Sequence, residues 1–135
     1  MRRIRIFGLP LGMLLFSGMM PAADKPSLGQ VLDGRFAGEE HDIVSLIEAM
    51  PANKFNFAPT MGEFKGVRTF ARQATHMATA IYMMSSAILE QKPPVDIGTG
   101  EDGPTSLQTK EQILNYVKGA FAFGHKALLS ITEKK

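Results

Sequence analysis

Three stretches of this sequence repeat their hydrophobic residues with the period of an α-helix. In residues 28–50, 64–88 and 114–128 the apolar positions recur at steps of three, four and seven. A capping-box pattern, Ser or Thr followed three residues later by Gln or Glu, precedes each stretch, at Ser27, Thr60 and Thr109. The sequence therefore predicts an all-α protein with helices over 28–50, 61–88 and 110–132.

Helices of similar length joined by loops favour antiparallel neighbours, so we expect an up-down helical bundle. The central helix carries a second apolar line besides its main stripe, formed by His76, Ala80, Met83 and Ala87. Three helices cover only part of such a surface, and a large exposed apolar patch marks an interaction site. We therefore expect a homodimer in which this line, with His76, faces the seam.

The first 23 residues have the pattern of a secretion signal. Arg2, Arg3 and Arg5 precede an apolar run from Ile6 to Met20, and small residues follow. A run of this length is shorter than the ~20 residues of a spanning helix, so we expect export without a lasting membrane span. The domain organisation predicted is a signal peptide at 1–23 and one helical domain at 24–135.

Composition excludes several classes of function. Without the leader the chain keeps 12 basic and 13 acidic side chains, which leaves no basic surface for nucleic acid. The absence of cysteine excludes disulfides, zinc-thiolate sites and a thiol nucleophile. Function must therefore rest on the histidines, the carboxylates or an apolar surface.

The three histidines have different expected surroundings. His41 lies opposite the apolar stripe of its helix and is expected in solvent. His125 lies at the edge of its stripe, where we expect a boundary histidine bonded to a loop or backbone group. His76 is either a buried structural histidine or a metal ligand in a groove between helices. Glu39 falls within an apolar stripe and either pairs with Arg35 or lines the same cavity as His76.

Two segments rich in proline separate the helices. In residues 51–60, Phe55 and Phe57 are expected to pin the segment to the end of the bundle. In residues 92–108 the acids suggest calcium, but the spacing of an EF-hand is not met and a solvated loop is favoured. These acids are Asp96, Glu101 and Asp102.

Residues 49–60, 67–78 and 90–94 resemble, in order and spacing, the corresponding segments of the DinB-like (damage-inducible, YfiT-type) superfamily. The resemblance runs from about residue 28 to 132. It implies a four-helix bundle that holds a divalent metal, usually zinc or nickel, with three histidines. One of them comes from the second helix and corresponds to His76, and the other two form H-x-x-x-H on the fourth helix. Characterised members are metal-dependent hydrolases or thiol transferases.

The sequence departs from this pattern because it contains no H-x-x-x-H and stops at Lys135, after the third predicted helix. We therefore expect a C-terminally incomplete domain that holds zinc or nickel weakly or not at all, because a catalytic site needs three ligands. No catalytic residue is assigned, and two functions stay open. One is an exported DinB-like metal-binding protein without full activity, and the other is a non-catalytic helical module that binds itself or a partner through its open apolar face.

Overall fold

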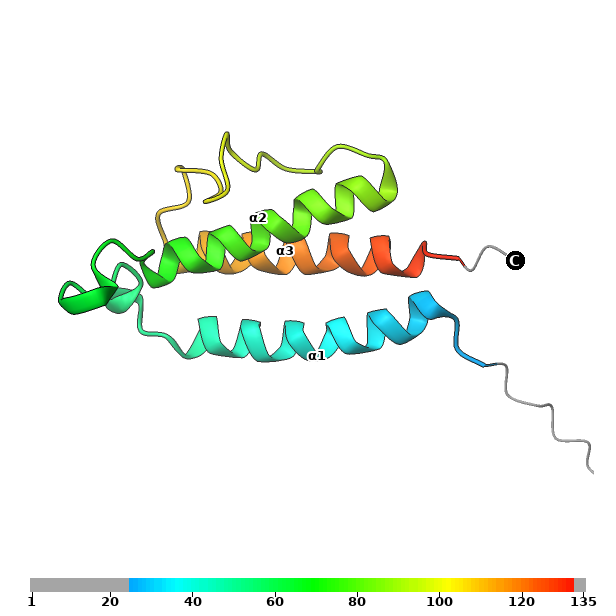
Figure 1. The fold of residues 1–135 in the computed structure, drawn as a ribbon, viewed down its shortest axis with the longest axis horizontal. Coiled ribbons are helices and arrows are strands. Elements are labelled where there is room, and N and C mark those ends of the chain that lie inside the picture. Colours follow the sequence, from blue (N-terminus) through cyan, green and yellow to red (C-terminus); the bar gives the residue numbers. More distant parts are fainter. Residues whose placement is uncertain (1–24, 133–135) are drawn as a thin grey trace, which may run out of the picture.

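The computed structural model describes residues 25–132, so the predicted signal peptide at 1–23 lies outside the described residues. The described chain is all-helical and has no strand, which confirms the predicted fold class. None of its helices combines the length and apolar character needed to cross a membrane. Its elements are α1 (Leu28–Ala49), the short 3₁₀ turns η1 (Ala52–Lys54) and η2 (Gly62–Phe64), α2 (Phe70–Leu89) and α3 (Lys110–Leu129) (Figure 1).

Two helices begin at their predicted capping boxes. The Ser27 hydroxyl accepts from the backbone N–H of Gln30 at 3.2 Å, and the Gln30 side chain accepts from the N–H of Ser27 at 2.9 Å. Thr109 and Gln112 form the same reciprocal pair at the start of α3. These bonds satisfy backbone donors that the first helical turn leaves without partners. α3 ends at Leu129, earlier than predicted.

The predicted start of the second long helix at Thr60 is wrong. α2 is capped by Thr69, whose side chain accepts from the backbone N–H of Arg72. Gly62 and Gly66 have φ angles of +69° and +87°, and such left-handed residues interrupt a right-handed helix. The residues before α2 therefore form an excursion from the end of the bundle (Figure 1).

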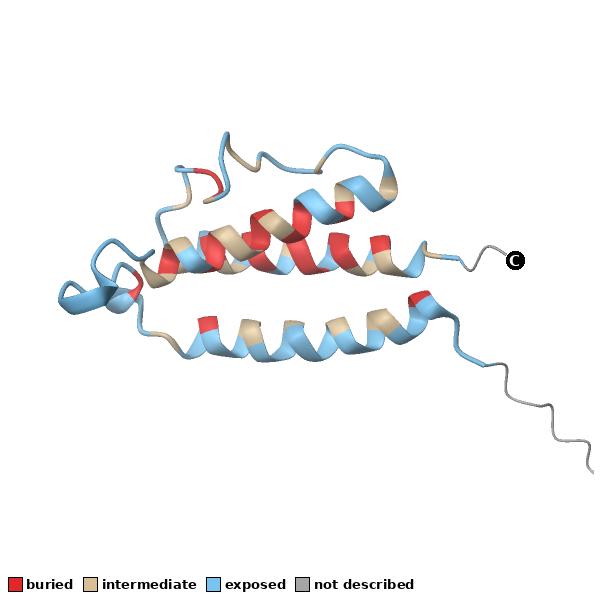
Figure 2. Ribbon diagram, in the orientation of Figure 1, coloured by how far each residue is buried: buried red, intermediate tan, exposed pale blue. Residues whose placement is uncertain are grey.

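α3 is the central helix of the bundle. It packs against α2 and against α1, whereas α1 and α2 have little direct contact with each other. Burial is concentrated where α2 meets α3, while α1 is largely exposed (Figure 2). Gly29 and Ile47 are the only buried residues of α1. The largest fully buried side chains of the core are Tyr82, Phe121, Ile47, Ile113 and Val117.

The helix directions differ in part from the up-down expectation. α1 and α3 are antiparallel, because Lys110 at the start of α3 donates to backbone carbonyls at the end of α1. α2 and α3 are parallel, since Thr79 bonds Tyr116 at 2.9 Å and Tyr82 packs on Phe123 further along both helices. The connection from 90 to 109 makes this possible by running back along the length of α2 (Figure 1).

Candidate functional site

His76 lies half-buried on α2, beneath the loop that connects α2 to α3. Its Nδ1 is 2.8 Å from the backbone oxygen of Glu101. A carbonyl only accepts hydrogen bonds, so Nδ1 carries the proton and Nε2 has the lone pair when the ring is neutral. This bond fixes the orientation and tautomer of the ring, as it does for many histidines at functional sites.

The connecting loop is held against α2 by further contacts. The Arg68 Nε donates to Asp102 Oδ1 at 2.6 Å, and this hydrogen bond lowers the pKa of the Asp102 carboxyl. Gly103 is buried against α2 with a φ of +80°, and a Cβ there would lie 2.8 Å from the Thr79 hydroxyl. The loop thus covers one part of the second apolar line of α2.

Two hollows lie along α2, and the second apolar line borders the first of them. The first, of about 270 Å³, is lined by His76, Ala80, Met83, Met84 and Glu101. The second, which we call the open groove, has a volume of about 220 Å³ and lies where all three helices meet. Met84 lines both hollows, so they lie next to each other. The open groove is lined by Phe36 of α1, by Ile81, Met84, Ser85 and Ile88 of α2, and by Gly124, Ala127 and Leu128 of α3.

The acidic residue in contact with His76 is not Glu39, the one that the sequence suggested, and the contact is made by a backbone oxygen and not by a carboxylate. Glu39 is exposed on α1 and does not line the hollow at His76, so that reading was wrong. Glu101 lies there instead, because the connecting loop folds over α2. Sequence periodicity does not reveal this contact, since a loop residue has no helical register.

The histidines do not converge on a metal site. His41 is exposed on α1, as predicted, and His125 is engaged elsewhere. Within residues 25–132 no three His, Asp or Glu side chains are grouped in a way that could hold a metal ion. The described residues therefore do not fit the three-ligand centre that the DinB-like resemblance implies.

His125 forms a polar cluster with two carboxylates of α1. Its Nδ1 lies 2.5 Å from Asp33 Oδ1 and its Nε2 lies 3.0 Å from Glu40 Oε2, both on α1. The predicted boundary position is correct, but the predicted loop or backbone partner is wrong. Asp33 and Glu40 are seven residues apart and so share one face of α1, a signal that the sequence contained.

The electrostatics of this cluster favour a charged ring. Both carboxylates only accept hydrogen bonds, so both ring nitrogens must donate, and only the imidazolium does so. The hydrogen bond to Asp33 raises the pKa of His125, burial of the ring opposes this, and the bond to Glu40 raises it further. The ring edge also packs on Phe36, with centroids 5.2 Å apart. His125 therefore joins α1 to α3 beside the open groove.

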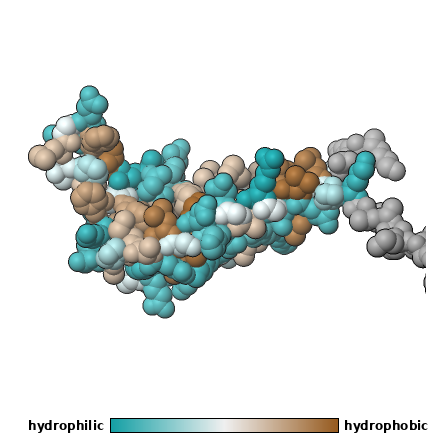
Figure 3. All heavy atoms as spheres, turned by 90° about the horizontal axis from the view of Figure 1, so that it is seen from below, coloured by the Kyte–Doolittle hydropathy of each residue, from teal (hydrophilic) through white to brown (hydrophobic). Residues whose placement is uncertain are grey.

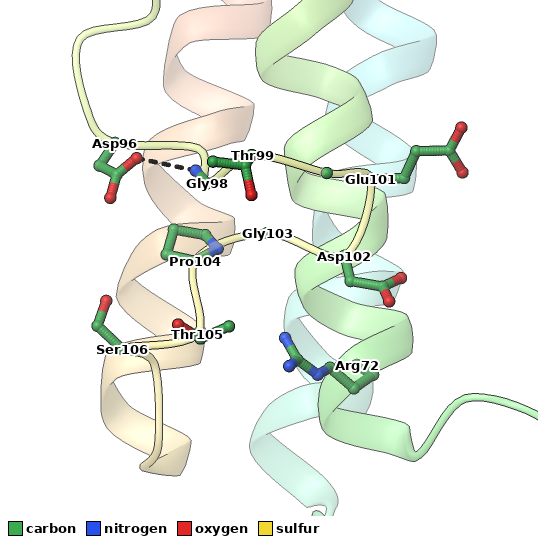
Figure 4. A pocket seen from close by; sticks show the side chains of 11 residues that line it. Arg72, Asp96, Gly98, Thr99, Glu101, Asp102, Gly103, Pro104, Thr105 and Ser106 are labelled. Carbon is green, nitrogen blue, oxygen red and sulfur yellow. Dashed lines mark hydrogen bonds between the residues drawn. The ribbon is translucent and has the colours of Figure 1, made fainter.

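A polar hollow of about 470 Å³ lies within the connecting loop (Figure 4). Its three carboxylates already have partners. Asp96 accepts from the backbone N–H of Gly98, Asp102 accepts from Arg68, and Glu101 lies 3.8 Å from the Arg68 guanidinium. Most of the loop is exposed, as the solvated-loop reading expects, but Gly103 and Pro104 are buried.

Comparisons with protein-family models, curated proteins and solved structures found no match for this chain. The resemblance to the DinB-like superfamily therefore stays a prediction. The open groove and the apolar surface of α2 are the features from which a function can be argued.

Proposed function

We propose that this protein is a helical module that associates with a second copy of itself through the outward surface of α2. We call this surface the α2 face and define it by Ala80, Met83, Met84, Ala87 and Ile88. The observation that carries the proposal is the exposure of its large side chains beside the open groove. Met84, which lines both hollows, is 60% exposed.

The arrangement of the helices explains why this surface is open. α1 and α2 both pack on α3 and leave a gap between them that is lined by apolar side chains. In a four-helix bundle a further helix packs across such a position and buries it. In the proposed dimer, α2 of the second copy supplies that helix.

The charge pattern of α2 favours a second copy over an unrelated partner. Between Arg72 and Glu90 the helix carries no Asp, Glu, Lys or Arg. A two-fold interface brings each surface against the same surface, so charges near the axis would repel their own copies. The helix residues of the α2 face carry no charge, so the one carboxylate that borders it is Glu101 of the connecting loop, at the His76 end. The flexible methionines of the face can adapt to the facing helix.

Static light scattering tests the association directly. We expect the average mass of the full chain to rise from that of a monomer toward that of a dimer across micromolar concentrations. Met84→Glu places a carboxylate in the seam, and the unpaired buried charges oppose association. Because Met84 is mostly exposed in the single chain, this variant should fold normally.

Ala122→Glu is the matched control, because Ala122 is exposed on α3 and lines neither hollow. We expect it to associate like the unmodified chain. A monomeric mass at every concentration, or equal masses for the two glutamate variants, would contradict the proposal.

Metal binding of the kind implied by the DinB-like resemblance stays a second proposal, supported by the fixed tautomer of His76. Two further ligands would have to come from outside the described residues. Elemental analysis of purified protein tests it. Stoichiometric zinc or nickel that His76→Ala removes would support a metal role, and metal-free protein of normal stability would oppose it.

A further inference from the structure

The excursion between α1 and α2 exposes large hydrophobic side chains at the end of the bundle opposite the open groove. We call these residues the apolar tip. Their exposed fractions range from 44% to 82%. Loop tips usually present small or polar residues, so four large apolar side chains within eleven residues need an explanation. The apolar tip consists of Phe57, Met61, Phe64 and Val67.

The base of the excursion is fixed to the end of the bundle, and the apolar tip lies beyond this base. Phe55 is buried and its ring meets that of Phe70 edge to face, with centroids 5.2 Å apart. The backbone N–H groups of Phe70 and Ala71 donate to the carbonyls of Phe57 and Phe55, at 3.0 and 2.8 Å. Phe57 itself is exposed, which corrects the expectation that both phenylalanines pin the segment to the bundle.

The tip is convex. It projects beyond the ends of the helices (Figure 1), and hydrophobic side chains are visible on the projection at the left end of the space-filling view (Figure 3). The left-handed glycines of the excursion have open space around them. A protruding apolar surface can insert into lipid, because lipid chains rearrange around it. A groove, in contrast, fits a rigid protein partner.

The charges around the tip are mainly basic. Residues 51–69 contain Lys54, Lys65 and Arg68 against a single acid, Glu63. Arg68 is paired with Asp102, whereas both lysines are exposed and take part in no ion pair among the described residues. Lysines beside inserted apolar side chains reach lipid phosphates with their charged ends while their stems stay in apolar surroundings.

We propose that the apolar tip inserts into the headgroup region of an anionic lipid surface, with Lys54 and Lys65 at the phosphates. This surface is separate from the α2 face, so the two proposals stand independently. When the tip is inserted, the long axis of the bundle points away from the membrane surface, and the open groove stays accessible.

Fluorescence tests the insertion at the residue itself, because the chain contains no tryptophan. Phe64→Trp in the full chain gives a single probe at the tip, and Leu129→Trp gives one at the far end. Both variants retain residues 1–23, so any lipid affinity of that segment is common to them. On adding vesicles of phosphatidylglycerol and phosphatidylcholine, we expect the emission of the tip probe to shift to shorter wavelength. Brominated lipid should quench it.

The charge dependence provides the second readout. Each lysine near an anionic surface strengthens binding about fivefold, so Lys54→Gln with Lys65→Gln should weaken it about 25-fold. Added salt should also weaken it. Three results would overturn the proposal: no response of the tip probe to anionic vesicles, an equal response to phosphatidylcholine alone, or a shift without vesicles that grows with protein concentration. The last result would assign the tip to contacts between protein molecules.

Discussion

Replacing His125 with Gln should destabilise the protein in a way that depends on pH. The imidazolium donates one hydrogen bond to Asp33 and one to Glu40, and these bonds join α3 to the sparsely buried α1. Hydrogen bonds to charged groups contribute about 1.5–3 kcal/mol each. The side chain is 24% exposed, so solvent screening favours the lower value. Gln keeps part of the bonding, which leaves an expected loss of about 2 kcal/mol or roughly 10 °C in Tm.

The direction of the pH effect follows from the raised pKa of His125. A group whose pKa is higher in the folded state than in the unfolded state stabilises the fold when it is protonated. The contribution is fully present below the unfolded value of about 6.5 and is lost as pH rises through the folded value. The free-energy difference between the unmodified chain and His125→Gln should therefore be largest at pH 6 and smaller at pH 9.

Chemical denaturation at the two pH values measures this difference. His41→Gln is the control, because His41 is exposed on α1, and it should match the unmodified chain at both values. If the loss of unfolding free energy caused by His125→Gln is equal at pH 6 and pH 9, the protonated ring is not its cause. A variant as stable as the unmodified chain at pH 6 would refute the bridge itself.

Three further outcomes are expected. Gly103→Ala should cost about 2 kcal/mol, because a left-handed residue gains a Cβ that meets α2, and thermal melting should show it. Phe70→Ala should cost about 3 kcal/mol, whereas Phe64→Ala should be nearly neutral because that ring is exposed, and denaturation of both tests the observed start of α2. Export predicts a mature N-terminus at Ala23 or Asp24, and a full-length mass in the native host would refute it.

The first residues of the helices can be predicted where a capping pattern is followed by a hydrophobic period. Both coincide at Ser27 and Thr109, and both helices begin there. At Thr60 the capping pattern predicts a helix start that the structure does not have. Gly62 and Gly66 adopt left-handed conformations there, which the sequence allows but does not require. Phe64 and Val67 continue the helical spacing of α2 toward its N-terminal side, so the hydrophobic period also predicts a helix in the excursion.

The spatial relations between helices were harder to predict. The hydrophobic period of a helix indicates which face is buried but not the direction of the helix relative to its neighbours, so it does not predict the parallel packing of α2 and α3. The long Pro- and Gly-rich segment at 92–108 was the available signal, because it is long enough to run back along a helix. The partners of His125 lie 85 and 92 residues away in sequence, and pairing them requires the relative register of α1 and α3.

Disulfide cross-linking tests the central proposal of a dimer through the α2 face most directly, because the chain has no cysteine of its own. Ala80→Cys, Met84→Cys and Ile88→Cys sample the length of that face, and Ala122→Cys is the control. A disulfide needs Cα atoms within about 7 Å, so only positions near the two-fold axis react quickly. We predict that at least one α2 variant forms a covalent dimer much faster than Ala122→Cys under mild oxidation. Equal, slow cross-linking of all four variants would contradict the dimer.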